Sequence, residues 1–335
     1  MKLRQEEFLV SLKKENAYSH PVSRIKIIET HISWILLTGR VAYKIKKALK
    51  FGNVLDFSNL ELRKNFCQKE VKLNKQLCGQ MYQGVVKIVK IDNNYKLVNL
   101  TEAGKPLEFA VKMREIPQKF RMDNLLGFNK INNRIIDLLT DKLVKFHNLA
   151  YTNSTISNYG RPQIMKAKIR ENFRTLSKLT KIDTIFENSL NWFIKNNYEL
   201  FDQRIRQSRI RDIHGDLYLK NIFFVKGRFY MYDRIEFNDS LRYADIAEDL
   251  AHLAMDIHYH RREDLQMSLI SYYIRKSNDT TLKNTIHFMM CYKACVRAKV
   301  CLFRAAQLTK KNQKSKYINQ ARRHFSLARK YLELF

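Results

Sequence analysis

The alternation of apolar and polar positions predicts a β-rich region in the first third of the chain. β-branched and aromatic residues fill positions 25–47 on both sides of Gly39, a pattern typical of two or three antiparallel strands. Strand character returns at 84–113, where a polar turn at 92–94 separates apolar runs. We expect these segments to pair in one sheet.

Helical spacing of apolar residues dominates the remaining chain. Ser58 and Glu61 form the capping box S-x-x-E in front of an amphipathic stretch, so a helix is expected to begin there. Beyond Pro117 the apolar spacing is helical almost throughout. The expected fold class is therefore α+β, with a small N-lobe of sheet plus helix at 1–115 and a larger, mostly helical C-lobe at 116–335.

One short hairpin is predicted inside the helical region. Positions 222–225 and 228–232 are β-branched and aromatic runs, and Lys226-Gly227 between them is typical of a tight turn. The two strands of a hairpin run antiparallel, so the segment before the first strand and the segment after the second become neighbours in space.

Asp216, Asn221 and Asp233 flank this hairpin and are expected to converge. ATP-dependent phosphoryl transfer uses one Asp to accept the hydroxyl proton, and an Asn and a second Asp to hold Mg²⁺ on the nucleotide phosphates. Mg²⁺ prefers such oxygen ligands. His214, next to Gly215, is expected to brace the loop, because the loop already supplies a carboxylate base.

The charge of the chain points to anionic partners. Lys and Arg number 62 against 32 Asp and Glu, a net charge of +30 over 335 residues. Such a field attracts polyanions, including nucleic acid, although a solvated lysine-rich surface is an equal alternative. Positions 233–256 contrast with this, because seven acids and two bases give them a net charge of −5. This acidic stretch suggests a cation site.

Cysteine usage and hydropathy favour a cytoplasmic location. The five cysteines include no C-x-x-C pair, which fits reduced thiols. No apolar run approaches the roughly 18 residues that a membrane span needs, and positions 1–14 are a charged amphipathic stretch without a signal-peptide core. We therefore expect no membrane partner.

A strand lysine and a helix glutamate complete the candidate chemistry. Lys44 ends Val-Ala-Tyr-Lys, which is close to the V-A-I-K of protein kinases, where the lysine pairs with nucleotide phosphates. Glu70 lies in the middle of the following helix, at a separation that suits the partner of this lysine. Alone, a strand lysine is usually just an exposed charge, and the alternative for Glu70 is an exposed partner of Asn74 or its neighbours one turn along the helix.

Several spaced motifs together resemble a known family. The chain is similar, from about residue 20 to 335, to the aminoglycoside phosphotransferase-like family of the protein-kinase-like superfamily. More narrowly, it resembles an uncharacterised branch that is sometimes fused to a P-loop kinase domain, although no P-loop motif is present in this sequence. The stretches that carry the resemblance are 29–47, 55–74, 108–117, 209–222 and 233–257.

The resemblance implies a two-lobed protein-kinase-like fold with ATP and Mg²⁺ between the lobes. Asp216 matches the catalytic base of the family, and Asn221 and Asp233 match its metal ligands. Lys44 matches the phosphate-binding lysine, and Glu70 the partner of that lysine.

Two assignments stay open at this level. Lys46 is an alternative to Lys44, because the strand register is not fixed by the sequence. Either Asp245 or Asp249 would be the buried brace of the catalytic loop, since they lie four apart on one face of a predicted helix.

Other nucleotide contacts are expected by position. The sequence has no G-x-G-x-x-G loop, so the segment from Thr30 to Ser33 is expected to cover the phosphates with backbone and hydroxyl donors. The backbone near Val111 and Met113, on the last strand before the second lobe, is expected to bond the adenine edge.

Two residues differ from those common in the family, and they are expected to affect which acceptor is phosphorylated. The branch often has His and Cys where this chain has Tyr218 and Arg234, both beside the site. We expect an ATP- and Mg²⁺-dependent kinase that transfers phosphate to a hydroxyl of a small molecule that the sequence does not identify. The alternatives are a kinase acting on RNA or protein, favoured by the net charge, and a catalytically silent kinase-like binding module.

Overall fold

The computed structural model describes residues 2–52 and 54–335, with side chains from Gln5 onward. The chain forms two compact units. The first comprises the chain up to Arg121 together with Phe223–Asn238, and the second comprises Met122–Ile222 with Asp239–Phe335. The sequence-based division at 115/116 differs in two respects, because it placed both residues 116–121 and the segment 223–238 in the second region.

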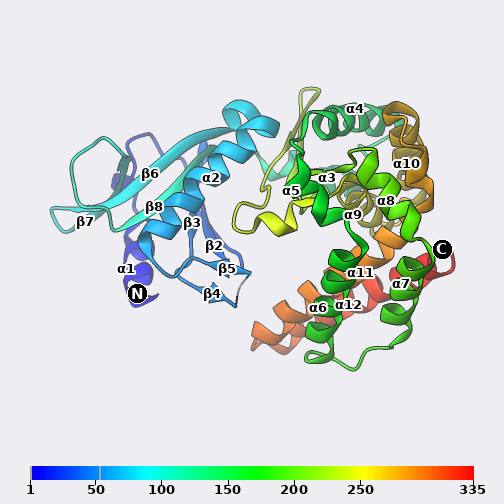
Figure 1. Cartoon of the computed structure of the whole chain (residues 1–335). Helices are drawn as coiled ribbons and strands as arrows, with labels where there is room; N and C mark the ends of the chain where they lie inside the picture. The colour runs from blue at the N-terminus through cyan, green and yellow to red at the C-terminus, as the bar shows by residue number, and fades with distance from the viewer. Residues whose placement is uncertain (1, 53) are drawn as a thin grey trace. The chain divides into compact units, whose positions relative to one another are not determined.

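A six-stranded sheet forms the centre of the first unit (Figure 1). Every neighbouring pair is antiparallel. In spatial order the strands are β1 (Lys26–Glu29), β2 (Ser33–Leu37), β3 (Val41–Lys46), β8 (Glu108–Arg114), β6 (Tyr82–Ile91) and β7 (Asn94–Asn99). A separate pair joins β4 (Lys50–Phe51) to β5 (Leu55–Asp56). The predicted sheet is therefore confirmed.

Different elements pack against the two faces of this sheet. One face carries an apolar core in which Phe8 and Leu12 pack with Tyr43 and Ile45, and helix α1 (Lys2–Ser11) belongs to this side. Helix α2 (Leu60–Cys78) packs against β8 and β6. Side chains alternate along a strand, so the residues of β3 between the core positions point away from that core, toward α2.

Helix α2 begins one residue later than its capping box indicated. Asn59 is the N-cap, and its side-chain oxygen accepts a hydrogen bond from the backbone N–H of Leu62 at 2.8 Å. Ser58 does not cap the helix, because its hydroxyl donates to Asp56 at 2.6 Å. An asparagine side chain caps a helix as well as serine does, so the prediction of the helix is confirmed and only its cap is corrected.

The predicted hairpin is present. Strands β10 (Ile222–Val225) and β11 (Arg228–Met231) are joined by Lys226 and Gly227, with φ angles of 47° and 77°. Two successive left-handed residues give the hairpin turn whose twist matches that of the strands. The thiol of Cys78 at the end of α2 donates to the carbonyl of Met231 at 3.1 Å, which attaches the hairpin to the first unit.

Helices make up most of the second unit, and α9 is almost entirely buried among them. It packs against α10 and α11, and α11 in turn packs along α12. None of the described helices combines the length and the apolar character needed to cross a membrane. The helices are α3 (Met122–Gly127), α4 (Asn133–Leu149), α5 (Ser154–Ser157), α6 (Pro162–Ser177), α7 (Ile185–Asn196), α8 (Tyr198–Arg206), α9 (Ile246–Tyr259), α10 (Glu263–Ser277), α11 (Ile286–Gln307) and α12 (Lys311–Leu332), and a two-stranded sheet pairs β9 (Ile210–Asp212) with β12 (Tyr243–Asp245).

Candidate active site

Two lysines and three carboxylates form one connected group in the first unit, here called the lysine–carboxylate cluster. Lys44 Nζ lies 2.9 Å from Glu70 Oε1 and 2.5 Å from Asp233 Oδ1. Lys46 Nζ lies 2.7 Å from Glu70 Oε2 and also pairs with Glu236. The fully buried carboxylate of Glu70 therefore joins the two lysines of β3 to helix α2, and the segment after the hairpin supplies the other two acids.

Attraction between opposite charges keeps both lysines protonated. Burial by itself lowers the pKa of Lys44, but the carboxylates of Asp233 and Glu70 outweigh it and hold that pKa well above its usual value. The pKa of Lys46 is raised in the same way. The two differ in access, because Lys46 has no exposed side-chain surface whereas Lys44 adjoins Asp233, whose side chain is 41% exposed.

The backbone of Asp233 adopts a conformation that is uncommon for a residue with a side chain. Its φ is 65°, in the left-handed region, where non-glycine residues are often found at functional sites. The backbone N–H of Asp233 donates to the hydroxyl of Tyr82 at 3.2 Å, and the next N–H, of Arg234, donates to Asn74 at 2.9 Å. Strand β6 and helix α2 thus hold this segment in place.

In the second unit, a buried carboxylate braces the predicted catalytic loop. The backbone N–H groups of His214 and Gly215 donate to Asp249 on α9, at 2.7 and 2.9 Å, and His147 lies 3.3 Å from the same carboxylate. Burial raises the pKa of Asp249, but the hydrogen bonds and charges of these partners outweigh it and lower the pKa. Of the two aspartates that the sequence left open, Asp249 is the one that contacts the loop.

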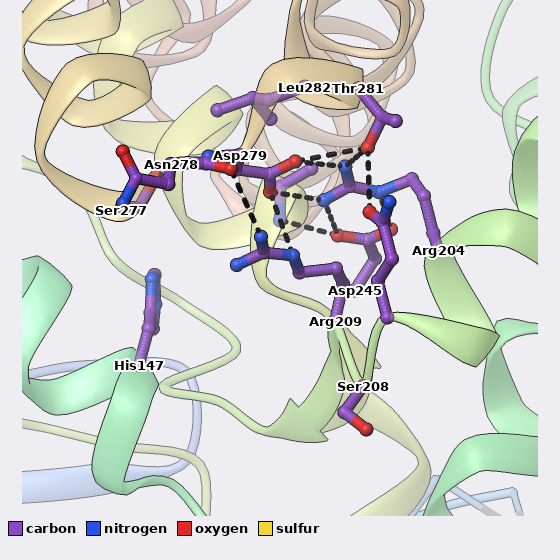
Figure 2. Close-up of polar contacts among 12 residues, drawn as sticks. His147, Arg204, Ser208, Arg209, Asp245, Ser277, Asn278, Asp279, Thr281 and Leu282 are labelled. Carbon is purple, nitrogen blue, oxygen red and sulfur yellow. Dashed lines mark hydrogen bonds and ion pairs between the residues drawn. The ribbon is translucent and has the colours of Figure 1, made fainter.

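Asp245 has a different role at the start of α9. It accepts a hydrogen bond from the N–H of Ala247 at 2.8 Å, which caps the helix. The guanidinium of Arg204 contacts Asp245 at 2.7 Å and Asp279 at 2.9 Å, and Figure 2 shows it between the two carboxylates. All three charged groups are buried, so this arginine fixes the end of α9 from which Asp249 projects one turn later.

Asp216 and Asn221 lie together at the end of the braced loop. The side-chain nitrogen of Asn221 donates to the carbonyl of Asp216 at 2.9 Å and to its carboxylate at 3.3 Å. Both residues belong to the second unit and Asp233 belongs to the first. The predicted convergence of the three side chains therefore stays a prediction.

The hydroxyl groups of the predicted phosphate-covering segment are used internally or buried. The Thr30 hydroxyl donates to the carbonyl of Ser33 and accepts the N–H of Ser33, both at 2.9 Å. Ser33 Oγ is buried with no hydrogen-bond partner among the described residues. The Thr30 hydroxyl is therefore already used within the turn, and the roles of Thr30 and Ser33 at the phosphates stay predictions.

The expected adenine contact at Val111 and Met113 needs correction. Strand β8 lies between β3 and β6, where Val111 pairs with Lys44 on one side and Met113 pairs with Tyr82 on the other. The sheet uses the backbone groups of an inner strand, so they are not open to a ligand. Ile116 follows this strand, and its backbone makes no hydrogen bond to any described residue.

Apart from Asp233, whose partly exposed carboxylate stays a predicted metal ligand, the acidic stretch at 233–256 is not an open cation site. Each of its carboxylates accepts a hydrogen bond or an ion pair, mostly from residues far away in the sequence, so its net charge is balanced by the fold. Asp249 and Asp256 accept backbone N–H groups of the loop. The ion pairs join Asp233 to Lys44, Glu236 to Lys46, Asp239 to Arg242, Asp245 to Arg204, and Glu248 to both Lys168 and Lys293.

Four residues that contribute to the surroundings of the candidate site residues were not identified from the sequence. Tyr82 and Arg204 act through contacts with residues more than 40 positions away, which no local pattern marks. His252 and Arg297 lie on helices whose apolar spacing predicts only which faces are buried. A buried histidine facing the loop was foreseeable from the position of His252 one turn after Asp249, once α9 was predicted to be a buried helix.

Two buried histidines are expected to make the second unit sensitive to acid. Burial, reinforced by the nearby charge of Arg297, lowers the pKa of His252 well below its usual range and that of His324 to about 3. An unfolded histidine binds a proton at a higher pH, so stability is complete above about pH 6.5 and is lost as the pH falls. At pH 5, His324 alone should cost about 2 kcal/mol.

This pH dependence can be measured by urea denaturation at pH 7.5 and pH 5.0. His324→Phe keeps the aromatic stacking on Tyr259, whose ring lies 4.3 Å away, and removes the titrating group. The variant should therefore lose less stability between the two pH values than the parent protein. An equal loss in both proteins would contradict the assignment.

Comparison with known proteins places the fold. No protein-family model matches the chain. Two curated relatives, uncharacterized proteins of Mycobacterium tuberculosis and Mycobacterium bovis, are each 30% identical to it over 324 residues. These matches cover 94% of this chain and 62% of either relative, so the chain spans less than two thirds of their length.

Solved structures with a similar fold are small-molecule kinases. A thermostable mutant of aminoglycoside phosphotransferase APH(4)-Ia has a TM-score of 0.51 at 9% identity, with 98% of this chain and 99% of that one covered. Plasmodium vivax ethanolamine kinase has a TM-score of 0.50 at 12% identity, covering 91% and 81%. Choline kinase from Cryptosporidium parvum also has 0.50, at 10% identity, covering 92% and 88%.

At identities of 9% to 12%, this similarity establishes the fold alone. The chain has the protein-kinase-like α+β fold of the aminoglycoside phosphotransferase-like proteins, and the resemblance predicted from its motifs is confirmed at that level. Nothing in the comparisons supports the nucleic-acid partner that the net charge left open.

Proposed function

We propose that the chain is an ATP- and Mg²⁺-dependent phosphotransferase whose acceptor is a hydroxyl group of a small molecule. The observation that carries this proposal is the lysine–carboxylate cluster. A lysine of an inner strand, a glutamate of the adjoining helix and an aspartate after a hairpin are in contact, as the order of these residues in the sequence predicted. That combination is the one kinases use to hold nucleotide phosphates and their metal ion.

The oxygen atoms of two predicted metal ligands fit Mg²⁺. Asn221 commits its amide nitrogen to Asp216, and its Oδ1 accepts no hydrogen bond from the described residues. Asp233 presents a partly exposed carboxylate. An amide oxygen and a carboxylate are the hard ligands that Mg²⁺ takes, so Asn221 and Asp233 would hold it. Bound Mg²⁺ would neutralise charge on the phosphates of ATP.

Asp216 is the proposed general base. Its side chain is 37% exposed, and the hydrogen bond from Asn221 orients its carboxylate. As the acceptor oxygen bonds to the γ-phosphorus and ADP leaves with the bridging oxygen, the hydroxyl proton passes to Asp216. Because Asp249 fixes the backbone of His214 and Gly215, the position of this base does not depend on a mobile loop end.

Access favours Lys44 over Lys46 as the phosphate-binding lysine of β3. Lys46 is sealed between Glu70 and Glu236 with no exposed side-chain surface, so a phosphate could not reach it without displacing a carboxylate. Lys44 borders the exposed Asp233 and is the proposed phosphate-binding residue. By the same logic, the free backbone of Ile116 is a better candidate for the adenine edge than the paired backbone of β8.

The small-molecule acceptor is supported by the solved structures of similar fold, which are named as kinases of ethanolamine, choline and aminoglycosides. The purified chain should be stabilised against heat by Mg²⁺-ATP. It should also transfer label from γ-labelled ATP to at least one member of a panel of sugars, aminoglycosides and nucleosides. A protein that shows neither effect would contradict the proposal.

Replacement of Lys44 by Met should lower kcat/KM for ATP by about 10²-fold, because a preorganised positive donor to the phosphates is lost. Lys46→Met should act differently. It leaves the buried Glu236 without its cation and Glu70 with Lys44 alone, so it is expected to lower the free energy of unfolding by about 3–5 kcal/mol. Steady-state kinetics and urea denaturation of both variants separate the two roles.

Lys87→Met is the matched control for this pair. Lys87 is a buried lysine of the same sheet, on β6, and it donates only to the backbone carbonyls of Glu102 and Gly104. This variant should keep kcat/KM for ATP within a few-fold of the parent protein. Equal loss of activity in the Lys44 and Lys87 variants would show that the effect is structural.

A further inference from the structure

Arg297 on α11 is a partly buried cation without a counter-charge. Its guanidinium lies over the ring of Tyr218, 4.6 Å from the ring centre, and forms no hydrogen bond or ion pair with any described residue. Its Nε atom is buried without a partner. Other buried arginines of the second unit are paired, Arg204 with Asp245 and Arg242 with Asp212.

An unpaired cation that has lost much of its water is unfavourable by several kcal/mol. Two carboxylates are near enough to raise the pKa of Arg297, although burial opposes them, but neither contacts it. Asp216 is the proposed base, and Asp256 accepts the backbone N–H of Leu219 at 3.0 Å. The fold therefore leaves the guanidinium available to an anion from outside the chain.

His252 on α9 lies beside the same ring and beside the base. Its ring stacks on that of Tyr218, with centres 5.3 Å apart and planes at 11°, and its Nδ1 lies 3.7 Å from Asp216 Oδ1. The residue is only 3% exposed, yet neither ring nitrogen has a hydrogen-bond partner among the described residues. A buried imidazole normally makes such bonds, so an unfilled donor and acceptor adjoin Asp216.

We propose that Arg297 and His252 bind an anionic oxygen group, phosphate or carboxylate, of the hydroxyl compound that Asp216 activates. The acceptor would then be a phosphorylated or carboxylated alcohol, and this inference rests on the proposed function. Arginine suits the role because its planar guanidinium bonds phosphate or carboxylate through two parallel donors.

The surrounding charges support an anion over a cation. The carboxylates of the acidic stretch that belong to the second unit already have partners, as described above, so they offer little to a cationic amine. The net charge of +30 would draw an anionic acceptor toward the protein and repel a polycation. Tyr218, where the resembling branch often has His, supplies the ring that both Arg297 and His252 contact.

Matched acceptors test this directly. Glycerol and glycerol 3-phosphate, glucose, glucosamine and glucose 6-phosphate, and gluconate as the carboxylate member would be compared in label transfer from γ-labelled ATP. The parent protein should show kcat/KM at least about 10²-fold higher for anionic members than for their neutral counterparts. A preference for the cationic or neutral members would overturn the inference while leaving the proposed function intact.

Variants of Arg297 and His252 test whether these two residues cause the preference for anionic acceptors. Arg297→Met should raise KM for anionic acceptors by about 10²-fold and leave transfer to neutral acceptors unchanged, and Arg297→Lys should restore part of the loss. His252→Phe keeps the stacking on Tyr218 and removes both ring nitrogens, so it should also weaken the binding of anionic acceptors selectively. This variant serves as the test if Arg297→Met does not fold. An equal loss for neutral and anionic acceptors would overturn the inference.

A binding readout separates this inference from the proposed function. Inorganic phosphate, without nucleotide, should raise the melting temperature of the parent protein and of Arg322→Met, an exposed arginine on α12, but not that of Arg297→Met. A phosphate effect that survives Arg297→Met would overturn the site. Failure of label transfer to every acceptor would contradict the proposed function, whereas the phosphate result would still decide for or against the anion site.

Discussion

Replacing Asp216 by Asn is expected to lower kcat for phosphoryl transfer by at least about 10³-fold while Mg²⁺-ATP still stabilises the protein. The substitution keeps the shape of the side chain and an oxygen that can accept the hydrogen bond from Asn221, which lies 3.3 Å away. It removes the ability to take up the hydroxyl proton. Transfer of label from γ-labelled ATP measures the first effect and thermal denaturation measures the second.

Asp202→Asn is the matched control for this variant. Asp202 is an exposed aspartate of α8 in the same unit, so its amidation changes the net charge equally and should leave transfer unchanged. Two outcomes would count against the role of Asp216. One is a variant that keeps more than a tenth of the parent kcat. The other is a variant that loses nucleotide-induced stabilisation, which would point to a structural role in the loop.

Replacing Arg204 by Leu should lower the free energy of unfolding by about 3–5 kcal/mol. The side chain is 1% exposed and binds the buried carboxylates of Asp245 and Asp279, so its loss leaves Asp245 without a cation and Asp279 with only the more distant Arg209, 3.7 Å away. Urea denaturation followed by far-UV circular dichroism is the suitable measurement, because the second unit holds most of the helices.

Arg206→Leu provides the comparison on the same helix. Arg206 is 61% exposed and pairs with the exposed Glu199, and such surface pairs contribute at most about 1 kcal/mol. Adding Asp279→Asn to the Arg204 variant should recover part of the loss, because a buried charge that keeps only the pair with Arg209 disappears. Similar destabilisation by the two arginine substitutions would contradict the importance of the buried network.

The parts of the fold that depend on local chemistry were predictable from the sequence. The turns at Asp92-Asn93 and Lys226-Gly227 have left-handed φ angles, which Asp, Asn and Gly tolerate, so the sequence marked both turns and the strands around them. The contact between Lys44 and Glu70 was also anticipated, since the order strand lysine, helix, glutamate limits where the glutamate can lie. The catalytic roles of these residues stay predictions.

Other features depend on pairings that the sequence order does not determine. Strand β8 comes last of the six in the chain but lies between β3 and β6, and this is why the backbone of Val111 is paired and not open to adenine. Arg204 and Asp279 are 75 positions apart and meet only when α8 and the segment after α10 pack on α9. Long-range pairing likewise places most carboxylates of the acidic stretch in ion pairs, so that of these acids only Asp233 stays a predicted metal ligand.

The assignment of Phe223–Asn238 to the first unit means that this unit is discontinuous in the chain. The polypeptide passes from one unit to the other after Arg121, after Ile222 and after Asn238. A fragment that ends at Arg121 would contain Lys44 and Lys46 but neither Asp233 nor Glu236, so two buried lysines would share the single carboxylate of Glu70. The first unit is therefore not expected to fold when it is cut out by truncation after Arg121.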